Sequence, residues 1–151
     1  MAQSSFPFEG IDTTETQYSQ LFRTFQDSVN GTYGGTELTG SVGTGLAVDV
    51  ALGQAMVRGH FYVSTATESL SLTTADATNP RLDLVILRLD PVANSIVLAV
   101  KDGTPAGSPT APALVQTDAG TYEVALATVL VPATSGVPTT ITDKRQFMGS
   151  R

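Results

Sequence analysis

The stretch Leu82 to Asp90, with the sequence LDLVILRLD, decides the fold class. Alternate residues of an extended chain point to opposite faces, and here both faces are apolar in the middle of the stretch. This pattern predicts a central strand that is covered on both sides. A turn at 91–95 is followed by IVLAVK at 96–101, which predicts an antiparallel neighbour. The centre of the fold is therefore expected to be an antiparallel sheet.

Shorter strand patterns lie on both sides of this hairpin. Upstream, an alternation over 46–50 breaks at Leu52-Gly53 and resumes over 55–61, which predicts another β-hairpin. Downstream, the three prolines and two glycines of 102–112 favour an extended surface loop. The last strands are expected at 122–131 and 137–142. The sequence thus predicts a mainly β domain, an antiparallel β-sandwich or a barrel-like form.

One amphipathic helix is expected before the β domain, between Asp12 and Asn30. Its apolar residues fall at offsets of 0, 3, 4, 7 and 11, on one stripe of a helix: Tyr18, Leu21, Phe22, Phe25 and Val29. Asp12 and Glu15 have the spacing of a capping box, and Asn30-Gly31 is a typical helix end. A stripe with three aromatic rings exceeds what a short surface helix needs. We therefore expect these five residues to form a subunit interface.

The chain length of 151 residues suits one domain with its own hydrophobic core. We expect residues 1–45 to form an N-terminal arm, the helix and a connector, since 31–45 contains six glycines. Residues 46–145 form the expected β domain, and 146–151 a C-terminal tail.

Composition and charge exclude several classes of function. The chain has 8 Lys and Arg against 14 Asp and Glu, a net charge of −6, which opposes binding to nucleic acid. It has no cysteine, so disulfides, cysteine-ligated zinc and iron–sulfur clusters are ruled out. Residues 1–10 lack the basic and apolar regions of a secretory signal, which predicts synthesis in a cytoplasm. The apolar runs have only strand length, so no membrane insertion is expected.

The reactive side chains do not suggest an enzyme. His60 is the only histidine, which leaves no pair for a metal, and a lone histidine here suggests a strand residue at a sheet edge. No G-x-S-x-G motif accompanies it. The aspartates are expected to face solvent or cap turns: Asp49, Asp83, Asp90, Asp102 and Asp143. We expect no catalytic residue, metal or cofactor.

Arg88 and Asp90 lie two residues apart, on one face of the central strand. Such charges commonly pair across strands or with a neighbouring subunit. We expect them to have the role of a structural ion pair rather than to bind a ligand.

Several motifs occur in an order that resembles a module of tailed-bacteriophage minor tail and baseplate proteins. They are NPRLDLVILRLD at 79–90, GQAMVRG at 53–59, GTPA at 103–106, and YEV at 122–124 with DKR at 143–145. The resemblance spans roughly residues 40–145, outside the helix. It implies an adaptor that forms a homo-oligomer, most readily a trimer, and docks onto other tail proteins in a virion assembled in the bacterial cytoplasm. The chain ends six residues after Arg145, so the distal receptor-binding fibre of longer family members is not expected.

Two other functions remain open at this point. A capsid decoration protein on the head surface would have a similar acidic β domain. A glycan-binding β-sandwich for host recognition is less favoured, because such sites stack sugars on exposed aromatic rings and the chain has no Trp.

Overall fold

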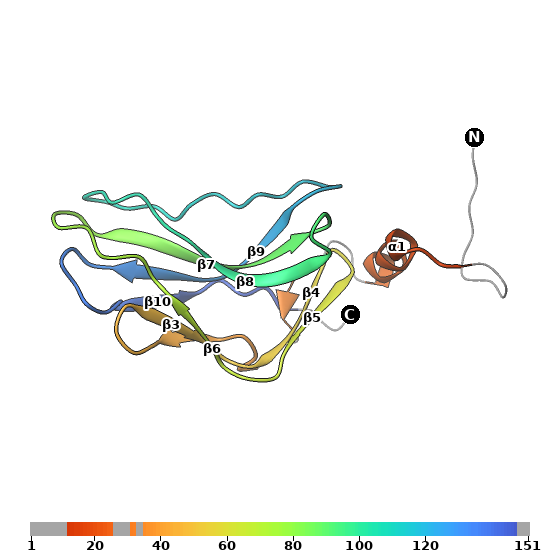
Figure 1. The fold of residues 1–151 in the computed structure, drawn as a ribbon, viewed down its shortest axis with the longest axis horizontal. Helices are drawn as coiled ribbons and strands as arrows, with labels where there is room; N and C mark the ends of the chain where they lie inside the picture. The colour runs from red at the N-terminus through yellow and green to blue at the C-terminus, as the bar shows by residue number, and fades with distance from the viewer. Residues whose placement is uncertain (1–11, 26–30, 33–34, 148–151) are drawn as a thin grey trace.

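The computed structural model describes residues 12–25, 31–32 and 35–147 (Figure 1). Over these residues the chain forms one helix, α1 (Glu15–Phe25), and then ten strands. The strands are β1 (Gly31–Thr32), β2 (Gly40–Val42), β3 (Ala47–Val50), β4 (Gly53–Val57), β5 (His60–Ser64), β6 (Glu68–Ser71), β7 (Arg81–Asp90), β8 (Ser95–Lys101), β9 (Tyr122–Val131) and β10 (Thr140–Asp143). The expectation of a mainly β fold preceded by one helix is confirmed.

The strands form three open antiparallel sheets, with the orders β10-β9-β7-β8, β2-β3-β6 and β1-β4-β5. In the largest sheet β7 lies between β8 and β9, as a strand that is apolar on both faces requires. Its register with β8 runs from Leu84 opposite Lys101 to Asp90 opposite Ser95, which confirms the predicted hairpin.

The hydrophobic core lies between the largest sheet and the two smaller ones. Val48 and Val50 of β3 and Val85 and Leu87 of β7 are completely buried in one cluster. The cluster extends through Ala55 of β4, so the sheet β1-β4-β5 continues the core toward the helix end of the molecule. The other buried members are Leu38, Val57, Leu72, Leu89, Val124, Leu126, Ala127, Val129 and Val131.

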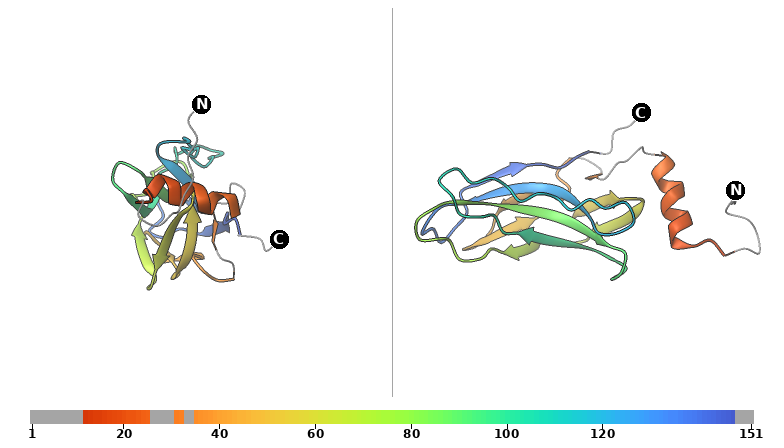
Figure 2. Two further views of the ribbon diagram at one scale, coloured as in Figure 1. Left: turned by 90° about the vertical axis from the view of Figure 1, so that its right-hand side faces the viewer. Right: turned by 90° about the horizontal axis from the view of Figure 1, so that it is seen from above.

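The opposite face of β7 is covered by the segment between β8 and β9. Ile86 is fully buried on this face, although no second sheet of the described residues packs there. Figure 1 and the right-hand view in Figure 2 show the segment running along the outer side of the largest sheet. It forms no strand over 102–115, as its prolines and glycines predict.

Two local expectations were wrong. The patterns at 46–50 and 55–61 do not pair with each other, because β3 pairs with β2 and β6 while β4 pairs with β1 and β5. The helix is capped two residues later than expected: Thr14 Oγ1 accepts the Gln17 N–H, and Gln17 Oε1 accepts the Thr14 N–H. The expected helix end at Asn30 lies outside the described residues.

Part of the glycine-rich segment expected to be a connector is packed into the fold. Leu38 is completely buried, and 40–42 pairs with β3. Leu38 has a φ of 55°, in the left-handed region. Burial of this side chain in the core compensates the strain of that backbone conformation.

Candidate functional site

The helix lies across one end of the β domain, where it meets the turn between β4 and β5 (Figure 2). Arg58 and Gly59 form this two-residue turn with φ values of 51° and 80°. Ser19 Oγ donates a hydrogen bond to Arg58 O over 2.5 Å. A Cβ on Gly59 would lie 3.0 Å from Ser19 Cα and closer still to Ser19 O. The helix backbone therefore rests directly on the turn, at a position that requires glycine.

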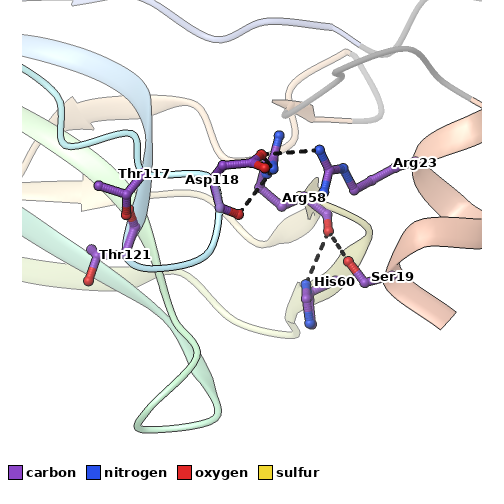
Figure 3. Close-up of polar contacts among 7 residues, drawn as sticks. All are labelled: Ser19, Arg23, Arg58, His60, Thr117, Asp118 and Thr121. Atoms are coloured by element: carbon purple, nitrogen blue, oxygen red, sulfur yellow. Dashed lines mark hydrogen bonds and ion pairs between the residues drawn. The ribbon is translucent and has the colours of Figure 1, made fainter. Parts of the chain in front are cut away.

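Two arginines share one aspartate beside this contact (Figure 3). Asp118, in the turn before β9, accepts from Arg58, and its Oδ1 lies 3.4 Å from Arg23 Nη2 of α1. Arg58 also stacks over the Tyr122 ring, with Cζ 5.1 Å from the ring centroid. Burial, together with the neighbouring Arg23 charge, lowers the pKa of Arg58. The side chain of Asp118 is 85% exposed, so solvent screens these ion pairs.

His60 adds a second polar connection between the β domain and α1. Its Nε2 lies 3.0 Å from Glu15 Oε1, and its Nδ1 lies 3.2 Å from Arg58 O. Both ring nitrogens face oxygen acceptors, so only a ring protonated at both nitrogens can donate to both. His60 begins β5, an edge strand of its sheet, which agrees with its expected position.

These groups surround a cavity of about 390 Å³ between α1, the β4–β5 turn and the turn at 117–121. Most of its polar lining is already paired within the chain, through Arg58, Asp118, His60 and Glu15. Across the described ranges, no three His, Cys, Asp or Glu side chains gather as a metal site. No helix within those ranges has the length and apolar character to cross a membrane. The arrangement is chemically suited to hold a helix in place.

The helix turns aromatic side chains to solvent along one flank. Tyr18 is 48% exposed and Phe22 is 43% exposed; we call these two residues the aromatic flank. Leu21 of the predicted interface is half-buried. The side chain of Phe25, and Val29 as a whole, lie outside the described residues. The structure thus brings Tyr18 and Phe22 together on the surface that the periodicity predicts.

Arg88 and Asp90 were expected in a structural ion pair, across strands or with a neighbouring subunit; Arg88 forms an ion pair across strands, whereas Asp90 caps a turn. Arg88 Nη2 lies 2.9 Å from Glu123 Oε1 of the neighbouring strand β9. Asp90 Oδ1 instead accepts the N–H groups of Val92 and Ala93, at 2.9 and 3.1 Å, and so caps the turn between β7 and β8.

The expectation that Asp83 faces solvent or caps a turn was wrong, because Asp83 belongs to a buried ion pair at the other end of β7. Arg81 Nε lies 2.9 Å from Asp83 Oδ1, and the two side chains are 5% and 0% exposed. Arg81 also donates to the carbonyl oxygens of Thr73 and Thr74, and Asp83 accepts the Gly103 N–H over 2.8 Å. The pair therefore ties two separate loops to β7. The sequence held a signal for it, because Arg-Leu-Asp occurs at both 81–83 and 88–90.

Glu123 is a second buried carboxylate that was not singled out. Its side chain is 1% exposed, and it accepts from Arg88, from Lys101 Nζ at 2.6 Å and from the Val115 N–H at 2.8 Å. Burial alone would raise the pKa of Glu123, but these hydrogen bonds outweigh it and hold the pKa below its ordinary value. Through Val115, the carboxylate fastens the proline-rich segment to the sheet.

The closing motif at 143–145 makes a similar connection. Arg145 donates to Asp143 and to the carbonyl oxygens of Gly35 and Glu37, and its side chain is 7% exposed. The Arg145 hydrogen bond to Asp143 lowers the pKa of that carboxyl despite its partial burial. The charged residues of the motifs at 79–90, 122–124 and 143–145 thus attach loops to the strands.

Comparisons with protein-family models, with curated proteins and with solved structures find no match to this chain.

Proposed function

We propose that this protein is a structural subunit of a tailed-phage virion, an adaptor of the minor tail or baseplate that self-associates through α1 and docks onto neighbouring tail proteins. The assignment to a phage tail rests on the order of motifs in the sequence. The observation that supports self-association is the aromatic flank, Tyr18 and Phe22, which is about half exposed in the single chain.

The way α1 is attached supports an assembly role. The contacts described above between α1 and the β domain are polar, through Ser19, Arg23 and Glu15, and no described side chain of α1 belongs to the hydrophobic core cluster. An amphipathic helix normally buries its apolar side against its own domain. Here the aromatic flank is directed to solvent, where burial against another copy would remove aromatic surface from water.

The location of the protein is tested by immunogold electron microscopy of the parent virion with antibodies against this chain. Label at the tail tip or along the tail is the expected result. Label spread over the head would overturn the tail assignment and favour a capsid decoration protein. Virions without label would contradict a structural role altogether.

Self-association is tested with Phe22→Asp, which places a charge in the aromatic flank. We expect wild-type protein to sediment as an oligomer and the variant as a monomer with an unchanged unfolding transition. Val92→Asp is the matched control, because Val92 is 94% exposed on the β7–β8 turn. A wild type that stays monomeric at all concentrations, or a variant that stays oligomeric, would overturn the role of α1.

A further inference from the structure

We propose that the cavity between α1 and the β4–β5 turn binds a carboxylate of a neighbouring protein, and that Asp118 is the ligand that fills this site in the isolated chain. This inference rests on the proposed docking onto other proteins and names the chemistry of one contact. Its basis is that Arg58 and Arg23 converge on a single carboxylate, beside a cavity of about 390 Å³ (Figure 3). Cavities of roughly 300 to 1,000 Å³ are typical of ligand sites.

The charges around Asp118 are not balanced. Arg58 and Arg23 carry two positive charges and share the one negative charge of Asp118. The other titratable residues of the described lining, Glu15 and His60, face each other. Glu15 precedes Arg23 by eight residues, about 12 Å along the helix axis. Burial and the neighbouring Arg23 charge lower the pKa of Arg58, so the two arginines still repel each other with Asp118 in place. More negative charge is therefore favoured beside them.

Asp118 satisfies the two arginines unequally. It accepts a hydrogen bond from Arg58, whereas its Oδ1 lies 3.4 Å from Arg23 Nη2. Charge-assisted hydrogen bonds between a cationic nitrogen and a carboxylate are normally about 2.7–2.9 Å long. Arg23 also keeps 36% of its side-chain surface exposed. A carboxylate that placed one oxygen on each guanidinium would satisfy both arginines.

Arg58 does not depend on the Asp118 carboxylate alone for its position. Its guanidinium stacks over the Tyr122 ring, and its Nη2 also donates to the backbone oxygen of Asp118 over 3.2 Å. The turn that carries Asp118 is closed at its base, where the N–H and Oγ1 of Thr117 both donate to Thr121 O, at 3.1 and 2.8 Å. The exposed Asp118 carboxylate can therefore rotate into solvent while the site around Arg58 stays assembled.

The internal ligand indicates the class of the external one. A site that holds the Asp118 carboxylate has the charge and the hydrogen-bond donors for a carboxylate from another chain. Thr16 and Gln20 of α1 add a hydroxyl and an amide to the lining. Solvent reaches Arg23 and Asp118, so an acidic side chain on the surface of a neighbouring protein has access to both arginines. Replacement of one exposed carboxylate by another makes such a contact reversible.

Acetate titration of the full-length chain, followed by two-dimensional NMR, tests the site. We expect acetate to shift the amide signals of the turn at 117–121 and of Ser19. Asp118→Ala should bind acetate roughly fivefold more tightly than wild type, because the competing carboxylate has been removed. A fivefold change corresponds to about 1 kcal/mol, the upper end for an exposed ion pair.

Three substitutions identify the groups that hold acetate. Arg58→Gln should abolish binding. Arg23→Gln, at a more exposed position on α1, should weaken it and keeps the test decisive if Arg58→Gln disturbs the β4–β5 turn. Lys144→Gln is the matched control, because it removes an exposed cation outside the cavity and should leave the affinity unchanged.

Other ions decide whether the contact is specific. Equal shifts with chloride at the same ionic strength would reduce the effect to screening and overturn the site. Tighter binding of phosphate than of acetate would overturn the assignment to a carboxylate. An acetate affinity that is the same in wild type and Asp118→Ala would overturn the role of Asp118 as the internal ligand.

A short peptide distinguishes a protein side chain from a small free acid. Gly-Asp-Gly with both ends blocked should compete with acetate, and Gly-Asn-Gly should not. Acetate binding without peptide binding would overturn the protein partner. Failure of the proposed function is recognised separately, since virions without label would refute a structural role whether or not the isolated chain binds acetate.

Discussion

The molecule has an arginine–aspartate contact at each end, and the two differ in burial. Arg81 and Asp83 are almost inaccessible and tie two loops to β7. At the helix end, Arg58 is bonded to Asp118, whose side chain is 85% exposed. The same pair of residue types therefore fixes one end of the fold and only loosely positions a helix at the other. The solvent around the carboxylate, rather than its partner, decides which role results.

Breaking the buried contact should have the largest effect. Asp83→Ala leaves Arg81 charged in an interior site and the Gly103 N–H without its acceptor. We expect the free energy of unfolding to fall by about 3–5 kcal/mol, measured by urea denaturation. Asp90→Ala in the second Arg-Leu-Asp tripeptide is the control and should cost only about 1 kcal/mol. Equal losses of stability from Asp83→Ala and Asp90→Ala would contradict the different roles of these two aspartates.

Replacing Glu123, the second buried carboxylate, should have the next largest effect on the free energy of unfolding. Glu123→Gln keeps the side-chain volume but removes the charge that accepts from Lys101, Arg88 and the Val115 N–H. We expect a loss of about 2–3 kcal/mol and faster hydrogen exchange in residues 113–116. Glu68→Gln on an exposed position of β6 should change stability by less than about 0.5 kcal/mol. Unchanged exchange near Val115 would show that Glu123 does not hold this segment.

The pH dependence of stability should also report on Glu123. The pKa of Glu123 is lower in the folded chain than in the unfolded chain, so the unfolded state binds more protons in acid. Stability contributed by Glu123 is complete above the unfolded carboxyl pKa, about 4.3, and is lost as the pH falls through the folded value. Urea denaturation between neutral and acid pH should show a shallower decline for Glu123→Gln than for wild type. Parallel curves would contradict this linkage.

Adding one methyl group at Gly59 should weaken the attachment of α1 to the β domain. In Gly59→Ala the new Cβ meets the Ser19 backbone, so we expect α1 to separate from the β4–β5 turn. Amide exchange in α1 should become faster, with a loss of about 1 kcal/mol in the stability of the β domain. Gly45→Ala is the matched control, because Gly45 has a similar φ of 69° and no atom within 4 Å of an added Cβ. Equal protection of α1 in both variants would argue against the contact.

Removing the exposed carboxylate should have the smallest effect. Asp118→Ala deprives Arg58 and Arg23 of their shared acceptor in a solvated position. We expect a change below about 1 kcal/mol, and a difference from wild type that shrinks as salt is added. A loss as large as that of Asp83→Ala would remove the contrast between the two ends.

The elements that sequence patterns predicted well are those defined by local periodicity. The alternation at 82–90 located β7 and its hairpin, and the spacing of Tyr18 and Phe22 located an exposed flank of α1. Periodicity says little about which strands pair. The strands at 47–50 and 53–57 follow each other closely, yet they belong to different sheets, because pairing depends on segments distant in the chain.

The ion pairs could not be assigned for a related reason. Arg-Leu-Asp at 81–83 forms a buried pair, while the same tripeptide at 88–90 sends Arg88 to Glu123 and Asp90 to a turn. The two copies begin at positions of opposite parity, so they occupy opposite faces of β7. The first copy shares the face of Val85 and Leu87, which packs toward the smaller sheets, and the second shares the face of Ile86, under the segment between β8 and β9. What covers each face is a tertiary property, and no spacing within the tripeptide reports it.

The proline-rich segment 102–115, which covers the largest sheet, also affects whether copies of this chain can pair through their sheet edges. Pro105, Pro109 and Pro112 have no amide hydrogen, so this segment shields the apolar face of β7 without becoming a strand that another copy could extend. A regular strand in the same place would add one more edge at which sheets of neighbouring copies could join. A cover without strand structure therefore gives neighbouring copies one edge fewer through which to aggregate into fibres.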